Sequence, residues 1–216
     1  MKITTIKSVL FFLILSLIAC SSNDSNEEEN IVPEKNSYEY YVNTTMQQAI
    51  DDLGITIHKG LTPPNVEGIY TINPFYCAKS TKPGDLFDDL EIGASTLTLS
   101  NQNTAKLSVD FKNFLIYSFV FQNETWQGKG SFISGEGNKF SILLHSDGEL
   151  AGTDHVSKFQ NLIILSGEID VQNNTIKGIK NLQMASIMSD DYGDPHKDLM
   201  EIGMGRFFTN SYAGVK

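Results

Sequence analysis

Four histidines are the first candidates for metal or acid–base chemistry in this chain of 216 residues. They are His58, His145, His155 and His196. No two of them have the i, i+4 spacing of a helical zinc motif, and none has a cysteine nearby. We therefore expect no metal site and no cofactor. The alternative that stays open is a site assembled from distant strands.

Two acidic clusters could bind a cation. The first contains Asp85, Asp88, Asp89 and Glu91, and the second contains Asp190, Asp191, Asp194 and Asp198. Neither has the alternating acids and central glycine of a calcium loop. We expect both to be solvated loops between strands. A weak calcium site in the second cluster is the alternative.

Nucleophilic chemistry finds little support in the sequence. No serine lies in a Gly-x-Ser-x-Gly turn, and no glycine-rich loop is suited to hold a phosphate. Cys77 follows Phe75 and Tyr76 in an apolar segment, which predicts a buried and inert thiol. The sequence therefore predicts a protein that is not an enzyme.

Cys20 is the residue with the most specific local context. Lys2 and Lys7 precede an apolar stretch over residues 9–19, which is shorter than the ~20 apolar residues needed to span a bilayer. The stretch Leu17-Ile18-Ala19-Cys20 that ends it resembles the lipobox of bacterial lipoproteins. The resemblance implies cleavage before Cys20, lipid on its thiol and amine, and attachment to a membrane by that lipid alone.

The charged residues divide the remaining chain. Residues 20–37 carry the expected lipid and an acidic run at 27–29, which is typical of a flexible tether. Acid close behind the cysteine resembles the surface-export signals of lipoproteins from Bacteroidetes, and a plain solvated spacer is the alternative. Residues 38–216 form the predicted folded domain.

Removing residues 1–19 takes away two lysines and no acids, so the formal charge falls from −10 to −12. This charge argues against nucleic-acid binding.

One helix is predicted over residues 44–53. Thr44 and Gln47 fit a capping box, Gly54 is placed to end the helix, and one face of the segment is apolar. That apolar stripe consists of Met46, Ala49, Ile50 and Leu53.

Strand-like segments with short turns between them fill the rest of the domain. They are Val66–Tyr76, Ser95–Leu99, Ala105–Phe111, Phe114–Phe121, Trp126–Ser134, Lys139–His145, Phe159–Val171, Thr175–Met188 and Leu199–Phe208. Breaks are expected at Lys112-Asn113 and Asp147-Gly148, among others. The pattern predicts a mainly β fold, a single antiparallel up-and-down barrel of about eight strands preceded by one short helix. A β-sandwich is the alternative.

Segment 114–121 is apolar on both faces, so we expect it under the helix, with an oligomer interface as the alternative.

The segment Pro63-Pro64-Asn65-Val66-Glu67-Gly68-Ile69-Tyr70 resembles the start of lipocalin-like lipoproteins from Bacteroidetes. In that family a helix precedes a Pro-Pro turn, and a Gly-x-aromatic motif opens the first barrel strand. The resemblance implies structural roles for Gly68, for Tyr70, which stands where lipocalins have tryptophan, and for Arg206, the chain's single arginine. Arg206 would stack on Tyr70 near the end of the barrel. An ordinary surface arginine is the alternative.

These features predict an outer-membrane lipoprotein that is held by covalent lipid and binds a small apolar ligand inside its barrel. Two alternatives stay open. One is a structural lipoprotein with a filled barrel that binds a protein partner. The other is a hydrolase with two carboxylates at the mouth of the barrel.

The lipid anchor can be tested with Cys20→Ala. The variant should lose metabolic labelling by lipid and leave the membrane fraction, because one lipidated residue is the only strong membrane determinant in the sequence. A variant that still sediments with membranes through high-salt washing would rule out the lipidated cysteine as the anchor.

Overall fold

The computed structural model describes residues 34–118, 123–152 and 154–216. The expected signal peptide, Cys20 and most of the tether lie outside these residues. In the part of the chain that is described, no helix is both long and apolar enough to cross a membrane.

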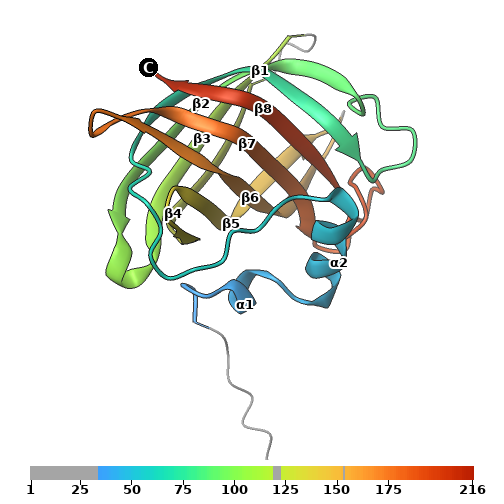
Figure 1. Cartoon of the computed structure of the whole chain (residues 1–216). Helices are drawn as coiled ribbons and strands as arrows, with labels where there is room; N and C mark the ends of the chain where they lie inside the picture. Colours follow the sequence, from blue (N-terminus) through green and yellow to red (C-terminus); the bar gives the residue numbers. More distant parts are fainter. Residues whose placement is uncertain (1–33, 119–122, 153) are drawn as a thin grey trace, which may run out of the picture. The chain divides into compact units, whose positions relative to one another are not determined.

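Eight strands form one closed antiparallel barrel in which each strand pairs with the next along the chain and the last pairs with the first (Figure 1). The strands are β1 (Gly68–Ser80), β2 (Leu90–Asn103), β3 (Ser108–Tyr117), β4 (Asn123–Glu136), β5 (Lys139–Ala151), β6 (Val156–Gln172), β7 (Thr175–Asp190) and β8 (Gly205–Val215). Two helices, α1 (Tyr38–Tyr41) and α2 (Thr44–Leu53), precede them, and a short 3-10 helix, η1 (Thr104–Lys106), joins β2 to β3. The predicted up-and-down barrel is confirmed, and the sandwich alternative is excluded.

The pairing of β1 with β8 closes the sheet. Tyr70 lies opposite Val215, and Ser80 lies opposite Arg206 at the other end of the same ladder. Closure removes both sheet edges and separates the alternating side chains into an inner and an outer set. Gly68 opens β1, as predicted.

The two ends of the barrel are filled differently. At the end where β1 begins, apolar side chains from all eight strands, most of them large, fill the interior. They are Tyr70, Ile72, Leu97, Leu99, Val109, Phe111, Ile133, Phe140, Ile142, Leu165, Ile169, Ile179, Leu182 and Ala213. We call this the closed end and the other the open end.

Helix α2 packs on the outside of the barrel. Its predicted apolar stripe is fully buried, and it shares an outer core with side chains from β4 to β7. Those partners are Phe132, Leu143, Leu162, Ile164, Ala185 and Ile187. The helix has its predicted bounds, and Gly54 ends it in the left-handed conformation at φ 78°. Asn43 caps its start by accepting a hydrogen bond from the Met46 N–H, so the predicted Thr44 cap is wrong.

Strand β3 corrects two predictions. The expected break at Lys112-Asn113 does not exist, because Asn113 points into the barrel and the ladders on both sides of β3 continue through it. The expected cover over segment 114–121 is also wrong for its described outer residues. Phe114 and Ile116 are 37% and 52% exposed, since α1 and α2 lie over the other strands.

Other boundaries also differ from the predictions. β5 runs through the expected Asp147-Gly148 turn to Ala151 and pairs with β6 along its whole length. The predicted last strand at 199–208 begins six residues too early. β8 starts at Gly205, and residues 191–204 form a loop with turns at Asp194 and Gly203, both of which have positive φ.

The outer core predicts a large effect of Ile50→Ala on stability. Ile50 is buried between α2 and the barrel, so the truncation should lower the free energy of unfolding by about 2–4 kcal/mol. Gln48→Ala, on the exposed face of the same helix, should change it by less than about 0.5 kcal/mol. Urea denaturation of the domain measures both. Equal effects of the two variants would contradict the docking of α2 on the barrel.

Candidate functional site

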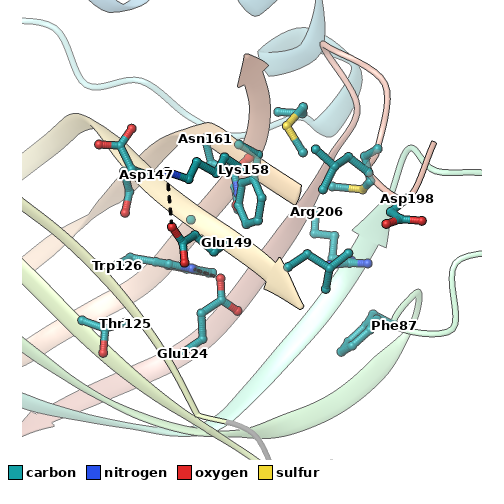
Figure 2. A pocket seen from close by; sticks show the side chains of 18 of the residues that line it. Phe87, Glu124, Thr125, Trp126, Asp147, Glu149, Lys158, Asn161, Asp198 and Arg206 are labelled. Atoms are coloured by element: carbon teal, nitrogen blue, oxygen red, sulfur yellow. Dashed lines mark hydrogen bonds and ion pairs between the residues drawn. The ribbon is translucent and has the colours of Figure 1, made fainter. Parts of the chain in front are cut away.

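A cavity of about 1060 Å³ occupies the open end of the barrel (Figure 2). It exists because several inward positions near this end hold small or polar residues in place of large apolar ones. Ser146 on β5, Asn161 on β6 and Ser186 on β7 are three such positions. Six aromatic residues belong to the lining, namely Phe87, Tyr117, Trp126, Phe159, Tyr192 and Phe208.

An aromatic cluster forms the floor of the cavity. The Phe75 and Phe208 rings stack with centroids 4.6 Å apart, and Trp126 contacts both, at 6.1 and 5.8 Å. Phe75 is fully buried beneath the cavity and joins the cluster to the core of the closed end. The floor is therefore rigid and apolar.

Glu124 places a carboxylate in this apolar setting. Its Oε1 accepts a hydrogen bond from Trp126 Nε1 at 2.5 Å, and its Oε2 accepts one from the Tyr117 hydroxyl. Burial, together with the charge and hydrogen bond of Glu124, raises the pKa of Tyr117, so the phenol stays protonated and donates. Both bonds are donated to Glu124, which is the pattern of an ionised carboxylate.

Asn161 supplies a second polar group. Its Nδ2 donates to Ser186 Oγ at 3.0 Å, and the side chain is 7% exposed. Its Oδ1 has no hydrogen-bond partner among the described residues. This oxygen is therefore an unsatisfied acceptor within the wall of the cavity.

Arg206 lies across the barrel from Glu124, on β8 (Figure 2). Its Nε and Nη2 donate to the two oxygens of Asp85 at 2.6 and 3.0 Å, and its guanidinium lies 4.3 Å from the centroid of the Phe87 ring. The arrangement ties the loop between β1 and β2 to the start of β8. Burial alone would raise the pKa of Asp85, but hydrogen bonds from Arg206 and Ser80 outweigh it and lower the pKa to about 2.

The predicted contact between Arg206 and Tyr70 is wrong, because the two residues lie at opposite ends of the β1–β8 ladder. Arg206 stacks on an aromatic ring as expected, but the ring is Phe87. Tyr70 is buried at the closed end, where its hydroxyl donates to the Val66 carbonyl at 2.8 Å. Its ring folds back over Gly68, where an added Cβ would lie 3.0 Å from the phenol. This contact explains the Gly-x-aromatic spacing.

Two loops at the rim of the cavity are joined by His155 and Asp198. His155 Nε2 lies 2.5 Å from Asp198 Oδ2, Ser157 donates to the same oxygen, and the His155 ring stacks on His196 with centroids 3.7 Å apart. Hydrogen bonds to Asp198 and Asp154 raise the pKa of His155, so protonation strengthens this link. Beside it, Lys158 pairs with Glu149 at 3.9 Å.

The acidic clusters are more structured than the sequence indicated. Asp85 is 4% exposed in its side chain and is the ion-pair partner of Arg206, so its prediction as a solvated residue is wrong. In the second cluster, Asp190, Asp191 and Asp194 accept hydrogen bonds from backbone N–H groups of their own loop. Within the described ranges, no three metal-binding side chains gather at one point. Cys77 is buried as predicted, and burial raises its pKa to about 11.

Sequence reasoning missed the polar centre of the cavity. Glu124 fell just outside the predicted strand, which was started at Trp126. The two residues are two positions apart, so they share one face of a strand, and this spacing could have identified an acid next to the single tryptophan. Tyr117 and Asn161 lay within predicted strands without any sign of their role.

Comparison with protein-family models, with curated proteins and with solved structures found no match for this chain.

The Arg206 contacts predict that Arg206→Lys is not a conservative change. Lysine cannot stack a planar group on Phe87 or form the forked pair with Asp85, so the free energy of unfolding should fall by about 1–3 kcal/mol. Lys158→Arg, at an exposed position, should stay within about 0.5 kcal/mol. Urea denaturation at neutral pH measures both.

The dependence of the free energy of unfolding on pH provides the check. The pKa of Asp85 is about 2 in the folded chain and 3.8 is its ordinary value. The stability that its ionised form contributes is therefore present above pH ~4 and is lost as the pH falls towards ~2. In Arg206→Lys the free energy of unfolding should fall less between pH ~4 and ~2. If the variant changes neither this fall nor the free energy of unfolding at neutral pH, the pair is not stabilising.

Proposed function

We propose that this protein is an outer-membrane lipoprotein, anchored through lipid on Cys20, whose barrel binds a small ligand with an apolar body and catalyses no reaction. The observation that carries the proposal is the cavity at the open end. Its volume of about 1060 Å³ is just above the usual range for ligand pockets, roughly 300–1,000 Å³.

The contrast between the two ends of the barrel supports a binding role over a filled structural barrel. The closed end is packed with side chains from every strand, and that end together with the outer core provides the stability. The open end instead combines an aromatic floor with a few inward polar groups, which is the usual composition of a ligand site.

The contacts of the acidic residues support binding over hydrolysis. Glu124 is held by two neutral donors, and Glu149 pairs with Lys158 at the rim. A glycosidase would need two carboxylates poised on either side of one bond, each free to take part in proton transfer or attack.

A neutral fluorescent probe tests the use of the cavity. N-phenyl-1-naphthylamine should bind the domain with enhanced emission, and Ser186→Phe, which fills the cavity from β7, should weaken binding by about tenfold or more. Thr71→Phe, on the outer face of β1, adds the same ring outside the barrel and should leave binding unchanged. Native mass spectrometry of the domain purified from its own cells should show a retained small molecule. Equal binding by both variants would contradict a ligand site in the cavity.

A further inference from the structure

The carboxylate in the cavity has no cation of its own. None of the ion pairs among the described residues includes Glu124. The two cations that the structure places in ion pairs around the cavity are already engaged, Arg206 with Asp85 and Lys158 with Glu149. A carboxylate in an apolar pocket is unfavourable unless a positive charge or further donors compensate it.

We propose that the cavity selects an organic cation, a molecule with a protonated amine that binds Glu124 and an apolar body that lies over Trp126 and Phe208. The inference rests on the proposed function, because it names the ligand class for that cavity. The two hydrogen bonds from Tyr117 and Trp126 fix the carboxylate in place and leave about half of its roughly four acceptor positions open.

The aromatic side chains around Glu124 suit the apolar body of such a ligand. Trp126 and Tyr117 both donate their polar hydrogens to the carboxylate, so their rings meet it edge-on. Trp126 and Phe208 offer apolar surface in the cavity floor next to the position of the bound amine.

The hydrogen-bonding capacity of Glu124 also selects against anions. A ligand that brings hydrogen-bond donors satisfies the open acceptor positions of the carboxylate, whereas a carboxylate or phosphate ligand does not.

The charge around the cavity favours the same sign of ligand. Among the charged side chains of its lining, Lys158 pairs with Glu149, Arg206 pairs with Asp85, and Asp198 pairs with His155. The described charged residues that line the cavity and have no ion-pair partner are then Glu124, Asp147 and Lys82, two acids against one base. The whole chain is acidic, with a formal charge of −10. The resulting field attracts cations to the mouth of the barrel and repels anions.

Three probes of equal length separate charge from apolar contact, namely n-octylammonium, 1-octanol and octanoate. Trp126 is the only tryptophan, so its emission reports directly on the cavity floor. Octylammonium should bind about tenfold or more tighter than octanol at neutral pH, and octanoate should bind more weakly than octanol. Octanoate binding as tightly as octylammonium would overturn the proposal.

Glu124→Gln keeps the shape of the side chain and removes its charge. It should weaken octylammonium binding by about tenfold or more and change octanol binding by less than about threefold. Glu136→Gln, at the other end of β4 and exposed, is the matched control and should change neither. Thermal unfolding of each variant verifies that it is folded. If Glu124→Gln does not fold, the ranking of the three probes on the natural protein still decides the question.

The outcomes separate the two proposals. Octanol and octylammonium binding with equal affinity leaves the cavity as a ligand site and overturns its preference for cations. Failure of all three probes and of the neutral dye overturns the proposed function and this inference with it. Tight octylammonium binding that Glu124→Gln leaves unchanged shows that the cation binds elsewhere and also overturns the inference.

Discussion

The structure depends on the hydrogen-bonded closure between β1 and β8. This ladder turns eight hairpin-linked strands into a barrel without edges, and it fixes which side chains face inward. One residue of slip in the ladder would exchange the inner and outer sets of a strand. The ladder also determines that Tyr70 and Arg206 are separated by its whole length, one serving the closed end and the other the open end.

The different packing of the closed and open ends follows from this closure. Tyr70 and the apolar side chains around it fill the closed end, and α2 buries a second apolar layer against the outside. The open end contributes less apolar burial, because Ser146, Asn161 and Ser186 occupy inward positions there. At that end the Arg206–Asp85 pair also stabilises the fold, because it holds the loop between β1 and β2 to β8.

Local patterns in the sequence predicted the elements well where one face is buried and the other is solvated. The stripe of α2, the hairpin turns and the Gly68 start of β1 belong to this class. Prediction failed where contacts between distant parts of the chain determine the structure. Asn113 has the composition of a turn, but it continues β3 because a closed sheet can place an asparagine inside. The position of α2 against β7 and β8, away from Phe114, depends on the complementarity of two surfaces, which periodicity does not encode.

The same reason explains why the candidate site was hard to find. Its members come from seven strands and two loops, so no spacing in the chain connects Glu124 with Arg206 or Asn161. Only the pair of Glu124 and Trp126 is local. Once the barrel closes, that pair places an acid on the inner face of a strand, which is costly to solvation and is typical of functional sites. The two donors that hold Glu124 are neutral, so they orient its charge without cancelling it. A carboxylate that is oriented and uncompensated is prepared for a positive partner, and the open end gives that partner its access.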